Sequence, residues 1–183
     1  MIKMLSQAAL LAACGLAMGA CTPTHTSAPA KKPPAADYQA EAPKATAAAN
    51  IKSICYNEAD LAIFRMRMVQ QEIAVATLQC QNPGGARALE ALYTQFLNKY
   101  RSELSTNTRE LQQLANRKRL NVDVVVTQFA NRTAHRPPVD PKFCDRSLRA
   151  LEWSLAPEVK TLTQVPPMYD LGPEMNVYPC PKP

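Results

Sequence analysis

Cysteine is the residue of this 183-residue chain whose type and spacing best suit covalent chemistry. The sequence contains six cysteines, and four of them lie after residue 50: Cys55, Cys80, Cys144 and Cys180. No Cys-x-x-Cys pair occurs, and His135 is the only histidine after residue 50, so the spacing fits no zinc site. In an exported chain, an even number of cysteines indicates disulfides, here two with three possible pairings. We therefore expect structural disulfides and no metal.

Other residues that could do acid–base or metal chemistry have structural explanations. His135 stands in a proline-rich loop with no nucleophile motif beside it. Met66 and Met68 are two residues apart on an expected helix, so their sulfur atoms point away from each other and would not converge on copper. Two carboxylate pairs lie where helices are expected to start, a position that the helix dipole favours for acids: Glu58 with Asp60, and Asp140 with Asp145. We therefore expect no catalytic residue and no cofactor.

The first 21 residues have the order of an export signal. Lys3 supplies a positive charge, residues 8–20 form an apolar run of 13, and two small residues precede Cys21. The run is shorter than the about 20 residues that a membrane-spanning helix needs. Met18-Gly19-Ala20-Cys21 resembles the lipobox of bacterial lipoproteins, which usually has Leu at the first of these four positions.

This resemblance implies that residues 1–20 are a signal peptide and that Cys21 is the lipidated first residue of the mature chain, with palmitate among its acyl groups. Thr22 after the cysteine implies an outer-membrane lipoprotein facing the periplasm. Two alternatives stay open. Leu11-Ala12-Ala13-Cys14 matches the motif letter by letter but leaves only about six apolar residues before it. Ordinary cleavage would instead give a soluble secreted protein.

The chain after Cys21 divides into a linker, a domain and a tail. Residues 21–50 are rich in Ala, Pro and Thr and nearly lack large aliphatic side chains, so they are expected to be a disordered linker. Residues 51–157 form the domain, and residues 158–183, with six prolines, form an extended tail packed on it. The net charge of +6, or +5 without Lys3, is too small and dispersed to indicate a nucleic-acid partner.

The apolar residues of the domain recur with the period of α-helices. A first helix is expected over residues 57–80, capped by Asn57. A second runs from about residue 89 to 118, as one long helix in preference to two with a break near Thr106. Val122 to Phe129 fit a third, although the Val-Val-Val run also has strand propensity. A fourth begins at Asp140-Pro141. The predicted fold is all-α, a small antiparallel bundle of about four helices.

Helix geometry selects one disulfide pairing. A helix over residues 57–80 is roughly 35 Å long, whereas the Cα atoms of a disulfide lie within about 7 Å, so Cys55 cannot pair with Cys80. In an up-and-down bundle the fourth helix starts beside the end of the first, and the tail returns to the start of the first. The sequence therefore predicts Cys80–Cys144 and Cys55–Cys180, while a break near Thr106 could place Cys144 at the other end.

The densest group of basic residues contains Arg117, Lys118, Arg119, Arg132 and Arg136. The helix dipole favours cations at helix ends, and the same residues are candidates for contact with anionic lipid or cell-wall polymer. We predict a non-enzymatic, lipid-anchored envelope protein, a structural or accessory subunit with an envelope-protein partner. The alternatives are a binding module for an anionic polymer or a small ligand, and an enzyme of unknown class.

Overall fold

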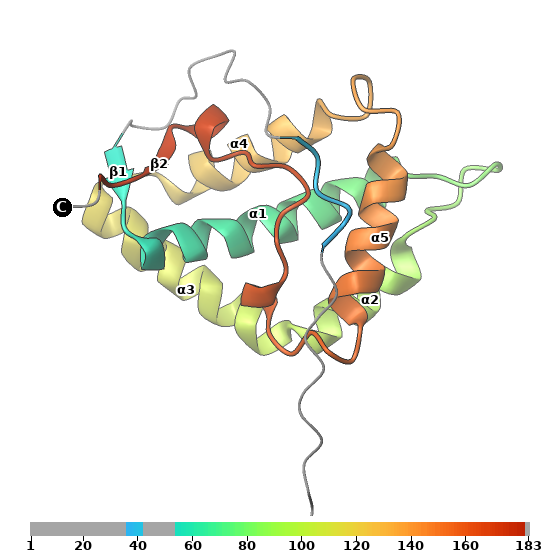
Figure 1. Ribbon diagram of the computed structural model, residues 1–183, viewed down its shortest axis with the longest axis horizontal. Helices are drawn as coiled ribbons and strands as arrows, with labels where there is room; N and C mark the ends of the chain where they lie inside the picture. The colour runs from blue at the N-terminus through green and yellow to red at the C-terminus, as the bar shows by residue number, and fades with distance from the viewer. Residues whose placement is uncertain (1–35, 42–53, 182–183) are drawn as a thin grey trace, which may run out of the picture. The chain divides into compact units, whose positions relative to one another are not determined.

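The computed structural model describes residues 36–41 and 54–181, which are mostly helical and carry two disulfides (Figure 1). In chain order the elements are β1 (Ile54–Tyr56), α1 (Glu58–Gln79), α2 (Glu90–Lys99), α3 (Arg101–Lys118), α4 (Val122–Ala134), α5 (Phe143–Leu155), the short 3-10 helices η1 (Leu162–Gln164) and η2 (Pro173–Met175), and β2 (Val177–Pro179).

The central element is α1, which contacts α2, α3, α4 and α5 as well as both strands. Asn57 caps it as predicted, because its side-chain oxygen accepts a hydrogen bond from the Asp60 amide at 2.8 Å. The apolar face of α1 enters the core, where Phe64 packs edge-on against Tyr56 and Phe129. The first predicted helix is therefore confirmed, and the other α-helices and both strands pack against it.

The preference for one long second helix was wrong, because the helix breaks at Tyr100. The alternative with two helices placed the break near Thr106, and the observed break lies six residues before that position. Tyr100 is buried, and its hydroxyl donates to the Ser154 carbonyl at 2.6 Å, which holds the junction against α5. α2, before the break, packs mainly on α5, and α3, after it, packs mainly on α1. The apolar residues that looked like one continuous helix face therefore contact two different helices.

The third and fourth predicted helices are present with adjusted ends. The Val-Val-Val run is helical in α4, which Asn121 caps by accepting from the Asp123 and Val124 amides. The last long helix starts at Phe143 rather than at Asp140, because the Asp140 side chain instead accepts from the Lys142 amide in the preceding turn.

The all-α prediction needs one correction, a two-stranded parallel sheet. β1 pairs with β2 in the register Ile54 with Val177, Cys55 with Tyr178 and Tyr56 with Pro179. The β-branched and aromatic residues in these short stretches favour extended backbone. The sheet therefore joins the start of the domain to the end of the tail.

The disulfides are Cys55–Cys180, with Cα atoms 4.6 Å apart, and Cys80–Cys144, with Cα atoms 5.6 Å apart. This is the pairing predicted from helix length together with an up-and-down order of the helices. Cys55–Cys180 joins β1 to the residue that follows β2, and Cys80–Cys144 joins the end of α1 to the first turn of α5. The antiparallel order of the expected bundle stays a prediction.

Candidate functional site

The C-terminal residues 157–181, here called the strap, run from α5 over one side of α1 and end beside β1 (Figure 1). The strap is irregular, yet its apolar side chains are buried as deeply as those of the helices. They are Val159, Leu162, Val165, Met168, Tyr169, Leu171, Met175 and Val177. The strap therefore completes the core and, together with α1, forms the walls of the candidate site.

A buried carboxylate on α1 fixes the middle of the strap. Glu72 is only 1% exposed, and its two oxygens accept hydrogen bonds from the Met168 amide at 2.7 Å and the Tyr169 amide at 3.1 Å. Burial raises the pKa of Glu72 to about 8, although the two amides and Arg136 favour the charged form. Asp170 raises this pKa further. Glu72 is thus the polar contact that holds the strap above the apolar face of α1.

Residues 36–41, here called the docked segment, lie against the strap and α5, although they fall within the stretch predicted to be a disordered linker. Tyr38 is 1% exposed, its ring meets Trp153 edge-on, and its hydroxyl donates to the Pro166 carbonyl at 2.9 Å. The Ala40 amide donates to the Met168 carbonyl at 2.8 Å. The linker prediction is therefore wrong for these six residues, because one buried aromatic side chain offsets the entropy of ordering them.

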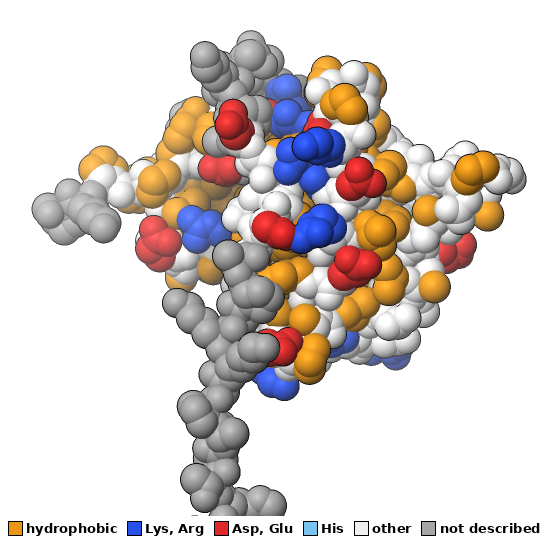
Figure 2. All heavy atoms as spheres, turned by 45° about the vertical axis from the view of Figure 1, so that its right-hand side comes forward, with side chains coloured by type: hydrophobic (Ala, Val, Ile, Leu, Met, Phe, Trp, Pro, Cys, Tyr) orange, Lys and Arg blue, Asp and Glu red, His pale blue; other side chains and the backbone are white. Residues whose placement is uncertain are grey.

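Two arginines of α5 hold the docked segment from the other side. Arg146 donates to the carbonyls of Tyr38 and Gln39, at 3.1 and 3.2 Å, and to Asp140. Arg149 pairs with Asp37, and both side chains are more than half exposed. Figure 2 shows Lys and Arg side chains interspersed with Asp and Glu on one face of the domain. This face therefore has no large patch of a single charge.

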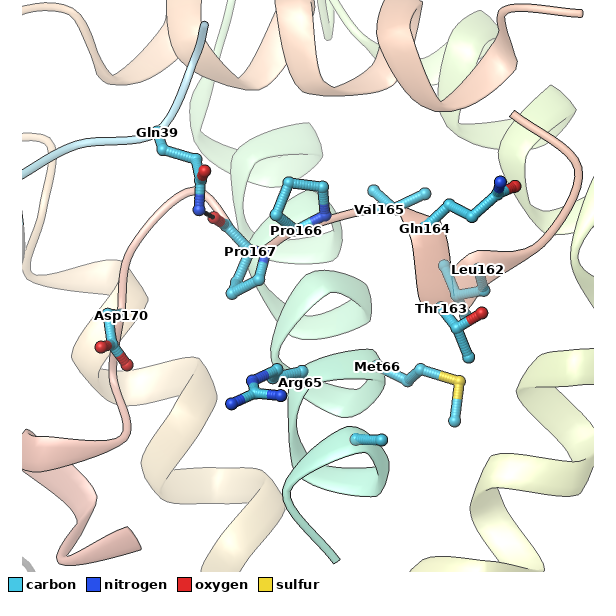
Figure 3. Close-up of a pocket in the computed structure, with 11 residues that line it drawn as sticks. Gln39, Arg65, Met66, Leu162, Thr163, Gln164, Val165, Pro166, Pro167 and Asp170 are labelled. Atoms are coloured by element: carbon cyan, nitrogen blue, oxygen red, sulfur yellow. Dashed lines mark hydrogen bonds between the residues drawn. The ribbon is translucent and has the colours of Figure 1, made fainter. Parts of the chain in front are cut away.

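A cavity of about 420 Å³ opens between α1 and the strap (Figure 3). Arg65 and Asp170 lie at one end of it, and Met66 lies at the other. Gln39 of the docked segment forms part of the upper wall and donates to the Pro167 carbonyl at 3.3 Å. The remaining lining is mainly strap: Leu162, Thr163, Gln164, Val165 and Pro166, with Ala62 from α1. The cavity thus combines an apolar part with a charged end.

A second network of charged groups holds the strap to the residues between α4 and α5 and to α5 itself. Asp140 accepts hydrogen bonds from the Tyr169 hydroxyl and from Arg146, both at 2.9 Å. Burial opposes ionisation of Asp140, but these bonds and the Lys142 amide lower its pKa below the usual value. Arg136 lies over the Tyr169 ring and pairs with Glu174. Each of these groups ties the strap to α5 or to the end of α4.

The structure does not bring the five predicted basic residues together. Arg117 and Lys118 both pair with the buried Asp60, at 2.8 and 3.8 Å, and Lys118 also lies over the Tyr56 ring. Arg136 is committed to Glu174. The two clusters stand at opposite ends of α4, about 20 Å apart at the rise of an α-helix. Arg119 and Arg132 make no ion pair with any residue that the structure describes.

The other residues singled out in the sequence have these places. Cys21 lies outside the described residues. His135 caps the end of α4 and is exposed. Asp60 and Asp140 serve the ion pairs above, Met68 is in the core, and Met66 lines the cavity. In the described ranges, 36–41 and 54–181, no group of three or more His, Cys, Asp or Glu residues is placed to hold a metal, and no helix has the length and hydropathy to cross a membrane.

Sequence reasoning missed Tyr38, Glu72, Arg65 and Asp170. The first two had a detectable signal, because Tyr38 is the only aromatic residue in 22–50 and Glu72 interrupts the apolar face of the first helix. Arg65 and Asp170 had none, since only the path of the strap places them at one cavity. Comparison of the chain with protein-family models, with curated proteins and with solved structures finds no match.

Proposed function

We propose that this chain is an exported, lipid-anchored accessory protein of the cell envelope, held at the outer membrane through Cys21 and facing the periplasm, and that it is not an enzyme. The export signal and the lipobox-like residues before Cys21 support the anchor. Two disulfides support export, since such bonds persist in oxidising compartments.

The observation that carries this proposal is the docked segment between Cys21 and the domain. Fifteen residues, 21–35, separate the proposed lipid from the docked segment, and a chain of that length can span at most about 50 Å. If Ile54 were instead the first contact, 33 residues could span about 110 Å. The docked segment therefore halves the distance at which the domain can work from its membrane.

Lipidation at Cys21 is tested by mass spectrometry of the mature amino terminus and by membrane fractionation. We expect an acylated Cys21 and recovery in the outer-membrane fraction. Cys21→Ser should release the protein, whereas Cys14→Ser should not. An unmodified terminus downstream of Cys21 would contradict the proposal, and release by Cys14→Ser would move the anchor to the alternative site.

An accessory role implies a partner protein in the cell envelope. Exposed large apolar side chains in the described part of the chain are few: Leu78, Val139 and Tyr178. We therefore expect a partner that contacts the polar surface near the anchor. Cross-linking of the lipidated protein in intact cells, followed by its purification in detergent, should give one defined envelope protein that is absent when Cys21→Ser is used. Recovery of the same protein with both forms would contradict a role that depends on the anchor.

The second candidate function is a small-ligand binding module, which the cavity between α1 and the strap favours. Its volume of about 420 Å³ lies in the range of small-molecule sites, roughly 300–1,000 Å³. An anionic polymer is less well supported, because Arg117, Lys118 and Arg136 are engaged by Asp60 and Glu174. Thermal-shift screening of small metabolites against the mature chain tests this function, since occupied cavities raise the midpoint of unfolding.

A further inference from the structure

The charged end of the cavity contains two opposite charges that do not pair with each other. Arg65 and Asp170 both line the cavity, and both also line a smaller neighbouring one of about 110 Å³. The ion pairs of the described residues include none between them. Figure 3 shows both side chains on the left of the opening, with Met66 on the right.

We propose that this cavity binds a small zwitterion with an apolar side chain, a free amino acid or a dipeptide, and this inference rests on the small-ligand function proposed above. The ligand carboxylate binds the Arg65 guanidinium, and its ammonium group binds the Asp170 carboxylate. Its apolar side chain lies against Met66 and Pro166, which are only partly buried.

The charges of both residues are available to a ligand. The ion pair of Arg65 is with Glu58 at 3.6 Å, and both side chains are at least half exposed, so it competes weakly. Asp170 accepts the Gly172 amide through Oδ1 at 3.1 Å, which orients its carboxylate without neutralising it. A guanidinium and a carboxylate at the same end of one cavity match the two charges of an amino acid.

The apolar half of the cavity suits a side chain rather than a second charge. Met66 and Pro166 present partly exposed apolar atoms to the cavity, and the flexible thioether of Met66 adapts to side chains of different shape. Gln39 closes the upper wall, so the docked segment contributes to the site. The lining is therefore expected to recognise the ammonium and carboxylate groups of the ligand and to accept different apolar side chains.

The test is isothermal titration of the mature chain carrying Cys21→Ser, with L-leucine and leucyl-leucine as the two probes. Their relative affinity distinguishes a free amino acid from a dipeptide. We expect saturable binding of at least one probe. N-acetyl-L-leucine, which lacks the ammonium group, and L-leucinamide, which lacks the carboxylate, should bind at least about tenfold more weakly, as expected for the loss of one charge-assisted hydrogen bond.

Two variants assign this binding to the cavity. Arg65→Gln and Asp170→Asn should each raise the dissociation constant at least about tenfold, and the Asn side chain can still accept the Gly172 amide. Arg101→Gln and Asp123→Asn are matched controls on exposed helix positions and should change nothing. Unchanged unfolding midpoints verify that each variant folds.

Equal binding of the uncharged N-acetyl-L-leucinamide would overturn the zwitterion while keeping the small-ligand function. Binding that neither Arg65→Gln nor Asp170→Asn weakens would overturn the assigned site. Absence of binding by every probe, at concentrations up to millimolar, would overturn the inference.

Discussion

The strap and the docked segment are both irregular stretches laid against the helices, and they are held in different ways. The strap is closed by the Cys55–Cys180 disulfide and fixed at its middle by the buried Glu72. The docked segment has one buried side chain, Tyr38, and otherwise depends on hydrogen bonds and ion pairs near the surface. The comparison shows that the strap contributes many side chains to the core, whereas the docked segment contributes Tyr38 alone.

The two regions also depend on each other unequally. The docked segment binds the strap through the carbonyls of Pro166, Pro167 and Met168. The strap is anchored to α1, β1 and α4, none of which needs the docked segment. Loss of the strap should therefore release the docked segment, while loss of the docked segment should leave the strap in place.

The largest effect should come from the disulfide that closes the strap. Cys55→Ala with Cys180→Ala removes a cross-link between residues 125 apart, and should lower the free energy of unfolding by about 5 kcal/mol in the chain-entropy model. Guanidinium unfolding measures this loss. Hydrogen exchange should show the Ala40 amide losing protection together with the Met168 amide.

The control for this change is Cys80→Ala with Cys144→Ala, which removes a cross-link between residues 64 apart and should lower the stability by about 4 kcal/mol. This second variant leaves the strap joined to β1, so protection of the Met168 amide should follow global unfolding alone. If both variants expose the Met168 amide equally, the strap is not fixed locally by Cys55–Cys180.

The second effect is release of the docked segment by Tyr38→Ala. Truncating a buried aromatic ring costs about 3–5 kcal/mol in a core, and here the loss is limited to the free energy of docking, about 2–3 kcal/mol. Limited proteolysis at residues 36–41 should become rapid, while the Met168 and Tyr169 amides stay protected. Tyr38→Phe, which removes only the hydrogen bond to Pro166, should cost about 1 kcal/mol. Loss of protection at the Met168 and Tyr169 amides in Tyr38→Ala would show that the strap also depends on the docked segment.

The helices were predictable because their apolar periodicity and their caps are local properties. Asn57 starts α1 as expected, and the Val-rich run of α4 is helical because apolar spacing outweighed strand propensity. The length of α1 excluded only the Cys55–Cys80 pairing, and the expected up-and-down order of the helices selected the observed pairing from the two that remained. The break at Tyr100 was not predictable, because it arises from a tertiary hydrogen bond to Ser154.

The candidate site was hidden for the same reason. Its walls come from segments that are distant in the sequence, the docked segment, α1 and the strap, and no spacing rule relates them. Composition also misled, because an Ala- and Pro-rich stretch was treated as uniform although Tyr38 within it can bury a whole ring. A single aromatic residue in an Ala- and Pro-rich stretch can therefore indicate a segment that packs on the domain.

The third effect concerns how Glu72 holds the strap. Glu72→Gln keeps one acceptor oxygen and puts an NH₂ group in place of the other, so one strap amide faces a donor, at a cost of about 1–2 kcal/mol. The folded-state pKa is raised to about 8 from 4.5, so the wild-type stabilisation is complete below 4.5 and is lost as pH rises through 8. Urea unfolding should show wild-type stability falling between about pH 4.5 and 8, by up to about 1.4 kcal/mol per pH unit, and levelling off above pH 8.

In the Glu72→Gln variant this fall should be absent, since the amide does not titrate. The charged groups near Glu72 are Arg136, which favours its ionised form, and Asp170, which opposes it; both are unchanged in the variant. Identical pH slopes for the two proteins would show that Glu72 stays ionised on its two amides, and that the strap is held by charge rather than by a buried neutral acid.

The smallest effect should follow from Arg149→Gln, which removes the surface ion pair of the docked segment. Arg149 and Asp37 are 53% and 59% exposed, and water and salt screen such pairs. The hydrogen bond from Arg149 lowers the pKa of Asp37, so the pair attracts, but the unfolding midpoint should not change measurably. Proteolysis at residues 36–41 should increase slightly at low salt and match wild type at ~1 M salt, where the Debye length is about 3 Å. Arg101→Gln, at an exposed arginine outside the docked segment, should match wild type at both salt concentrations. If Arg149→Gln instead frees the docked segment as fully as Tyr38→Ala does, charge rather than the buried ring holds it, and the proposed distance between membrane and domain would depend on ionic strength.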